Sequence, residues 1–124
     1  MDISKLEATI NYSFKNKSLI NEALTHRSYL NENTSWSLPH NERLEFLGDA
    51  VLELAATEEL FNRFPEEDEG KMTSLRAALV NYQMMAQVAR EINLESFILL
   101  SRGEARDTGR AREVILANVL EALI

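Results

Sequence analysis

The chain has 124 residues, of which 45% are hydrophobic and 27% are charged, a composition typical of one globular domain with a core. Its net charge of −7 disfavours binding to polyanions unless a divalent cation reverses the local sign. The absence of cysteine excludes disulfides and thiolate metal sites and suits a reducing cytoplasm. Early charges argue against a signal peptide, and no apolar run approaches the ~20 residues of a membrane span.

The residue pattern predicts an all-α protein, because helix formers dominate and no strand-type alternation is sustained. In chain order, helices are expected over residues 2–10, 16–28, 41–64, 68–92 and 113–124. The helix over 16–28 is expected to place Leu19, Ile20, Ala23 and Leu24 on one apolar face. The helix over 68–92 is expected to bury Leu75, Leu79, Met85, Val88 and Ala89.

Three segments between these helices are expected to be irregular. Residues 31–38 are polar and end before Pro39, which biases the preceding residue away from helix. Residues 65–70 form a break. Residues 101–112 contain two glycines and are predicted to be a flexible basic loop, either solvated or in contact with phosphate. The arginines of this loop are Arg102, Arg106, Arg110 and Arg112.

The helix predicted over residues 41–64 carries its acids along one line. At about 100° per residue, Glu42, Glu45 and Asp49 fall in a stripe roughly 60° wide, and Glu53 extends it by a turn. Nearly all other residues of its first half are apolar or small. Carboxylates between packed apolar surfaces are costly unless a proton, a base or a metal ion neutralises them. The pattern predicts a metal site, with a solvated acidic face as the alternative.

The last predicted helix carries a second oxygen pair, Asn118 and Glu121, in an apolar setting. Alone, this pair indicates a surface edge or a buried hydrogen bond. If the two acid-bearing helices cross, however, their oxygen atoms converge as in helical carboxylate proteins, and hard cations such as Mg²⁺ prefer such ligands. The acidic run 66–69 favours a solvated turn at a helix start, with Glu69 near the site as the alternative.

The stretch HNERLEFLGDAVLEL over residues 40–54 closely resembles the signature of the ribonuclease III endonuclease domain. The resemblance continues through ALTHRSY, DEGKMTSLRAALV and GEARDTGRAREVILANVLEALI, and so covers residues 6–124. It implies an all-helical, homodimeric domain that cuts double-stranded RNA with Mg²⁺, for which Mn²⁺ can substitute. It also implies 5′-phosphate and 3′-hydroxyl products with short 3′ overhangs, in the processing of rRNA and mRNA precursors.

The resemblance also implies roles for individual residues. Asp49 and Glu121 match the catalytic carboxylates, and Glu42 and Glu69 match acids that contact substrate or the outer shell of the site. Phe46 matches an aromatic residue that inserts into the partner subunit. The implied metal ligands are Glu45, Asp49, Asn118 and Glu121.

Two departures from the family pattern modify these expectations. The family more commonly has Asp where this chain has Asn118, and an amide removes one negative charge from the cation site. The last helix ends on Leu123 and Ile124 without a cap. We therefore expect residues 1–124 to be one C-terminally truncated endonuclease domain, without the double-stranded-RNA-binding domain of most members.

Two other functions stay open on the sequence alone. A domain of the same fold could bind duplex RNA without cutting it. The amide at Asn118 and the expected truncation favour this alternative, and the retained Glu45, Asp49 and Glu121 disfavour it. A helical carboxylate metalloprotein unrelated to RNA would need Glu-x-x-His spacing, which the chain lacks. The expected partners are double-stranded RNA and a second copy of the chain, with no membrane and a cytoplasmic location.

Overall fold

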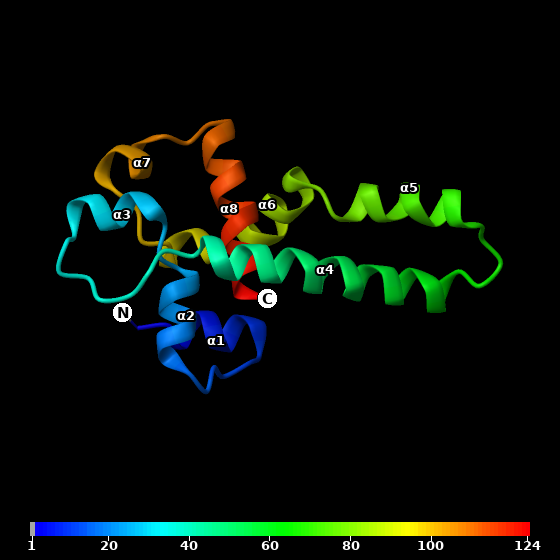
Figure 1. Cartoon of the computed structure of the whole chain (residues 1–124), viewed down its shortest axis with the longest axis horizontal. Coiled ribbons are helices and arrows are strands. Elements are labelled where there is room, and N and C mark those ends of the chain that lie inside the picture. Colours follow the sequence, from blue (N-terminus) through cyan, green and yellow to red (C-terminus); the bar gives the residue numbers. More distant parts are fainter. Residues whose placement is uncertain (1) are drawn as a thin grey trace.

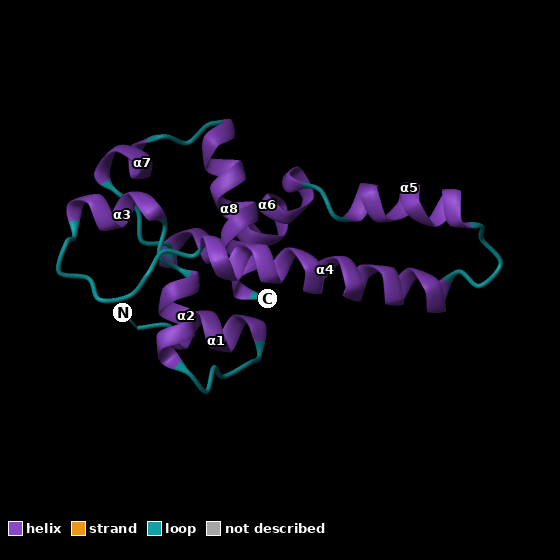
Figure 2. Cartoon of the chain, in the orientation of Figure 1, coloured by secondary structure: helices purple, strands orange, loops and turns teal. Residues whose placement is uncertain are grey.

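The computed structural model describes residues 2–124, and these residues form eight α-helices, one 3₁₀ helix and no strand (Figure 2). The predicted all-α class is confirmed. No helix among residues 2–124 has the length and hydropathy required to cross a bilayer. In chain order the elements are α1 (Ser4–Ile10), α2 (Lys17–Ala23), α3 (Arg27–Glu32), α4 (Glu42–Arg63), α5 (Glu69–Leu79), α6 (Tyr82–Glu91), η1 (Leu94–Phe97), α7 (Arg102–Arg106) and α8 (Arg110–Leu123).

Helix α8 lies at the centre of the fold, where it crosses α4 and packs along α6 (Figure 1). It is apolar on several faces because neighbours cover several faces, and α2 and η1 also contact it. Apolar side chains from α1, α2, α6, η1 and α8 complete one core. The largest of those that are fully buried are Leu6, Ile20, Leu24, Leu94, Leu116 and Val119.

Helices α4 and α5 leave this core together and form an antiparallel arm (Figure 1). Within the arm, Arg76 of α5 pairs with Glu53 at 3.2 Å and donates a hydrogen bond to Thr57 at 2.9 Å. Only Gly48 and Leu60 of α4 are buried. The apolar faces of α4 are therefore largely uncovered within one chain, and the exposed large side chains of the arm are Phe46, Leu47, Val51, Leu54, Phe61 and Leu79.

The helix predicted over residues 68–92 is wrong, because two helices occupy this segment. Val80 leaves the helical region with φ −111° and ψ 72°, and the Asn81 side chain caps α6 by accepting a hydrogen bond from the Met84 backbone N–H at 2.9 Å. Asparagine at this position satisfies a helix N-terminus that a continuous helix would not have. Of the predicted buried residues, Met85 and Ala89 are buried, Leu75 is half-buried, and Leu79 and Val88 are exposed.

Two further boundaries differ from the prediction. Helix α2 ends at Ala23 and a separate α3 begins at Arg27, because the His26 side chain caps α3 by accepting a hydrogen bond from the Ser28 N–H. Leu19, predicted on the buried face of α2, is 49% exposed. The segment predicted as a flexible basic loop contains α7 and the first turn of α8.

Asn41 ties the start of α4 to the turn between α2 and α3. Its buried side-chain amide donates a hydrogen bond to the carbonyl of Ala23 at 3.0 Å, and its backbone N–H donates to the carbonyl of Thr25 at 2.9 Å. Its own carbonyl accepts from the N–H of Glu45 at 2.8 Å. The first turn of α4, which carries two of the stripe acids, is thereby fixed to the core.

Replacing Asn41 with alanine is expected to lower the free energy of unfolding by about 1–3 kcal/mol, because the Ala23 carbonyl would lose its buried donor. Urea denaturation measures this loss. Asn62→Ala is the matched control, since Asn62 is exposed on the same helix, and its effect should stay within about 0.5 kcal/mol. Equal losses in the two variants would contradict the anchoring role.

Candidate functional site

The crossing of α4 and α8 brings the predicted site residues into one pocket of about 530 Å³. Asp49 and Glu121 come from different helices and line it together. Its complete lining is Glu42, Glu45, Phe46, Asp49, Asn118 and Glu121, which we call the acidic pocket.

Gly48 allows the backbones of α4 and α8 to lie in close contact where the two helices cross. A Cβ atom at this position would lie 1.7 Å from the carbonyl oxygen of Glu121 and 2.5 Å from its carbonyl carbon. Real Cβ atoms essentially never come within 3.0 Å of such atoms. Any side chain at position 48 would therefore push the backbone of α8 away from α4 and separate Asp49 from Glu121.

The site residues are less buried than the sequence pattern suggested. Glu45, Asn118 and Glu121 are half-buried, whereas Glu42 and Asp49 are exposed. The expectation of carboxylates enclosed between packed surfaces is thus wrong for Glu42 and Asp49, since much of the apolar surface of α4 is uncovered in the single chain.

Negative charge is nevertheless crowded in the acidic pocket. Partial burial, followed by the nearby charges of Asp49 and Glu45, raises the pKa of Glu121 to about 7. Partial burial, followed by the charges of Glu42 and Asp49, raises the pKa of Glu45. Both shifts mean that the ionised carboxylates lack compensating positive charge, so the pocket favours a proton or a cation.

The donor chemistry fits a hard divalent cation that keeps several water ligands. Within residues 2–124, no group of three or more His, Asp or Glu side chains forms a closed metal cluster. All polar side chains of the acidic pocket offer oxygen donors, however, and Mg²⁺ typically takes only one or two carboxylates, with water and phosphate oxygens completing its shell. The open pocket leaves room for such additional ligands.

Glu42 has two basic neighbours, Arg27 and His40. Arg27 of α3 donates a hydrogen bond to Glu42 at 3.2 Å, and His40 Nε2 lies 3.8 Å from the other carboxylate oxygen. Arg27 begins α3, fifteen residues before Glu42, so its contact with Glu42 is a tertiary one, whereas His40 lies two residues before Glu42 in the chain. They place a guanidinium at the rim of the acidic pocket.

The two remaining predicted residues, Glu69 and Phe46, differ in their position relative to the acidic pocket. Glu69 begins α5 at the far end of the arm and does not line the acidic pocket (Figure 1). Phe46 does line the acidic pocket, yet 82% of its surface is exposed. The structure of one chain therefore does not bring Glu69 to the site, and it leaves Phe46 available for contact.

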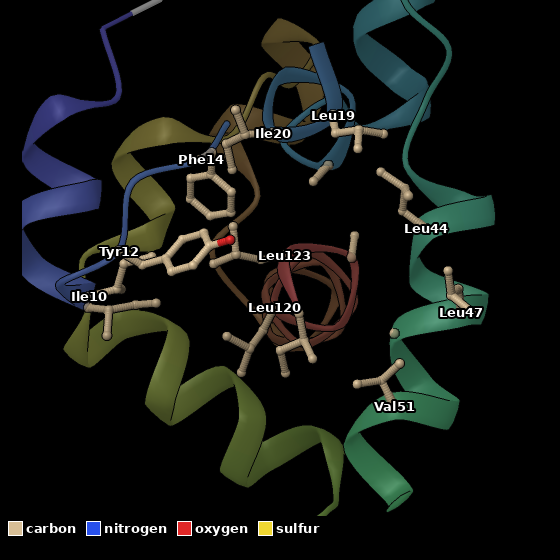
Figure 3. Close-up of a pocket in the computed structure, with 15 residues that line it drawn as sticks. Ile10, Tyr12, Phe14, Leu19, Ile20, Leu44, Leu47, Val51, Leu120 and Leu123 are labelled. Atoms are coloured by element: carbon tan, nitrogen blue, oxygen red, sulfur yellow. The ribbon is translucent and has the colours of Figure 1, made fainter. Parts of the chain in front are cut away.

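A second pocket, of about 650 Å³, lies on the other side of the same crossing and has no charged lining residue. Leu44, Leu47 and Val51 of α4 line it opposite Tyr12 and Phe14, with Leu120 and Leu123 of α8 between them (Figure 3). Its only polar side-chain group is the Tyr12 hydroxyl, so it offers no cluster for metal or acid–base chemistry. The acidic pocket is thus the candidate site despite its smaller size.

In the cation-free protein, the contribution of Glu121 to stability is expected to fall as pH rises from about 4.5 to about 7. The pKa of Glu121 is higher in the folded chain than its ordinary value of 4.5, so the folded state holds the proton more tightly. Its stabilising contribution is complete below pH 4.5 and is lost above pH 7. Solvent screening of this half-buried group limits the loss to about 1 kcal/mol.

Urea midpoints in EDTA, at about pH 5 and about pH 8, measure this effect. Glu121→Gln cannot ionise, so it should be more stable than the wild type at the higher pH and of similar stability at the lower pH. A variant that loses as much stability as the wild type between these pH values would contradict the assignment.

Comparison with known proteins places this geometry in a family. Residues 16–124 match the model of the family described as ribonuclease-III-like. The chain is 47% identical over 120 residues to ribonuclease 3 of Oleidesulfovibrio alaskensis and 49% identical over 124 residues to that of a Sulfurovum species. These alignments cover 97% and 99% of this chain but 52% of each relative, so the chain spans about half the length of the curated relatives it matches.

A solved structure gives the same assignment. The nuclease domain of ribonuclease III from Campylobacter jejuni, described for flexibility in a region involved in dimer formation, superposes with a TM-score of 0.87 at 45% identity. The match covers 98% of this chain and 81% of that one. With a shared helical fold and close sequence similarity along nearly its whole length, this chain belongs to the ribonuclease-III-like family.

Proposed function

We propose that this chain is the catalytic domain of a divalent-cation-dependent endoribonuclease that hydrolyses phosphodiester bonds of double-stranded RNA. The observation that carries the proposal is the acidic pocket at the α4–α8 crossing. The similarity to proteins named ribonuclease 3 supports it. The proposed products carry 5′-phosphate and 3′-hydroxyl ends with short 3′ overhangs, and the proposed substrates are rRNA and mRNA precursors in the cytoplasm.

In the proposed mechanism, Mg²⁺, or Mn²⁺ in its place, would be held by the oxygens of Glu45, Asp49, Asn118 and Glu121. When bound, such a cation would supply positive charge beside the phosphate and would make a nearby water more acidic. Asp49 and Glu121 approach the reacting phosphate from two helices, and the rigid crossing at Gly48 keeps them in register. Asn118 contributes an amide oxygen without charge, which makes cation affinity depend on the three carboxylates.

Glu42 and Arg27 at the rim would contact the RNA backbone beside the scissile phosphate. Arg27 supplies a donor for phosphate oxygens, and its ion pair with Glu42 orients it. Such contacts read the shape of duplex RNA rather than its sequence, because side chains cannot enter the deep major groove of A-form RNA.

We further propose that a second copy of the chain covers the exposed apolar side chains around Phe46. Phe46, Leu54 and Phe61 are 82%, 67% and 68% exposed on α4, too much apolar surface for a helix that stays solvated. Two-fold pairing presents two equivalent acidic pockets, which suits the cleavage of both strands of a duplex. Glu69, at the end of the arm, would then contact substrate or the outer shell of a site from across the dimer.

Phe46→Ala is expected to raise the dimer dissociation constant by about a hundredfold, because buried aromatic anchors contribute about 2–4 kcal/mol to such interfaces. Sedimentation velocity over a concentration series measures the change. Val114→Ala removes an exposed apolar side chain from the first half of α8 and should leave the dimer dissociation constant unchanged. A monomeric wild type, or equal sedimentation of wild type and Phe46→Ala, would contradict the assignment.

The proposed function is tested by incubating the protein with a long RNA duplex and, separately, with one of its strands. Cleavage should require the duplex and Mg²⁺, stop in EDTA, and leave 5′-phosphate termini. Tight duplex binding without cleavage at any Mg²⁺ concentration would instead identify a binding module of the same fold.

A further inference from the structure

Helix α7 is held at its N-terminal end by α3. The backbone N–H of Arg102 donates hydrogen bonds to both carboxylate oxygens of Glu32, each at 3.0 Å. The backbone N–H of Ser101 donates to the hydroxyl of Ser28, also on α3, at 2.9 Å. Arg102 lies seventy residues after Glu32, so this contact is a tertiary one. Glu32 is otherwise an exposed residue.

The C-terminal end of α7 is held by a buried arginine of α8. One nitrogen of the Arg112 guanidinium donates to the carbonyls of Glu104 at 2.9 Å and Ala105 at 3.1 Å. The other terminal nitrogen pairs with Glu95 of η1. Arg112 is only 6% exposed, so its charge depends on these partners, and they in turn fix the last turn of α7.

We call the contacts of Glu32 and Arg112 with α7 the clamp. The clamp is needed because α7 has only five residues. An isolated helix of this length is unstable in water, since the entropy lost in forming its first turn is not recovered. Without Glu32 and Arg112, residues 101–109 would behave as the mobile loop that their glycines and polar residues suggest. The two contacts therefore convert a loop-like sequence into an ordered element.

Three guanidinium groups on α7 and at the start of α8 are exposed to solvent. Arg102, Arg106 and Arg110 are all exposed, and Arg110 also lies over the ring of Tyr82 at 5.6 Å. Within residues 2–124, Arg102 and Arg106 form no ion pair with an acidic side chain.

We propose that α7 is a preformed phosphate-binding element for double-stranded RNA, with Glu32 and Arg112 as the positioning residues that keep it ordered. The inference rests on the proposed function for its substrate. Because α7 is already ordered in the free protein, the conformational entropy of the segment is lost during folding and not during RNA binding. An acidic residue, Glu32, then strengthens binding to a polyanion.

The direction in which removal of Glu32 changes RNA binding separates the proposal from simple electrostatics. Removing an acid from a negatively charged protein should tighten binding to RNA, but Glu32→Ala is expected to raise KM for duplex RNA by about three- to tenfold, with kcat within about twofold of wild type. Glu91→Ala removes the same charge from an exposed position at the end of α6 and should leave KM equal to or lower than that of the wild type. Glu32→Gln keeps an oxygen acceptor for the Arg102 N–H and should restore most of the loss.

Amide hydrogen exchange supplies the second readout. Residues 102–107 should be protected in the wild type and lose protection in Glu32→Ala but not in Glu91→Ala, with exchange in α4 unchanged. A wild type that cleaves duplex RNA while Glu32→Ala shows an unchanged or lower KM would overturn the clamp alone. A wild type that cleaves no duplex RNA would overturn the proposed function and the phosphate-binding role together. Fast exchange of residues 102–107 in the wild type would overturn the preformed state.

Discussion

Replacing Asp49 with asparagine is expected to lower kcat for duplex RNA cleavage by about a thousandfold while duplex binding persists. The substitution keeps the size of the side chain and removes its negative charge. Asp49 lines the acidic pocket with Glu121, and Asn118 already supplies an uncharged oxygen there. A second amide would leave too little negative charge to hold the cation beside the scissile phosphate.

Glu121→Gln should produce a loss of the same order, because it removes the other carboxylate at the crossing. The matched control is Glu53→Gln on the same stripe of α4. Glu53 pairs with Arg76 and does not line the acidic pocket, so its substitution should leave kcat within about threefold of wild type. Single-turnover cleavage at saturating enzyme separates chemistry from binding. A Glu53→Gln loss equal to that of Asp49→Asn would contradict the pocket assignment.

The long-range features of the site could be predicted because they follow from helix periodicity and family resemblance. The bounds predicted for the acid-bearing helix, 41–64, differ from those of α4 by one residue at each end. Glu45, Asp49 and Glu121 lie in turns that no break interrupts, so the spacing alone places them on one face of each helix. Their meeting in one pocket then requires only that the two helices cross.

Features that depend on tertiary contacts could not be predicted in this way. The break between α5 and α6 does carry a local signal, because Asn81 is a favoured N-cap residue whose side chain accepts a hydrogen bond from the Met84 N–H, but the apolar pattern continues through it and predicts one helix. The contacts at the two ends of α7 come from Glu32 and Arg112, which lie outside that helix. A loop-like composition therefore predicted a flexible segment where the structure has a clamped helix.

The burial of the stripe could not be read from the sequence either. Apolar residues beside the acidic stripe predict that another element packs over them, but they do not identify that element. In one chain, α8 covers only the side of α4 around Gly48, so Asp49 and Phe46 remain exposed. The role of Gly48 is similarly invisible in a helix pattern, where glycine is merely an unfavourable residue.

Replacing Gly48 with alanine is expected to lower the free energy of unfolding by about 3 kcal/mol or more, although alanine favours helix. The new Cβ would lie 1.7 Å from the carbonyl oxygen of Glu121, and both atoms belong to helices of the core crossing. No rotamer relieves a clash between a Cβ and a backbone oxygen. The helices must separate, which opens the packing between α4 and α8.

The same separation should reduce cleavage by about a hundredfold or more even where the variant remains folded, because a shift of about 1 Å in a positioned group costs that much. Gly70→Ala is the matched control. Its Cβ would meet only the side chain of Asp68, at 3.5 Å, in the first turn of α5. It should be neutral or stabilising by up to about 1 kcal/mol. If urea denaturation and cleavage rates were the same for both alanine variants, close approach at Gly48 could not be what holds Asp49 and Glu121 together.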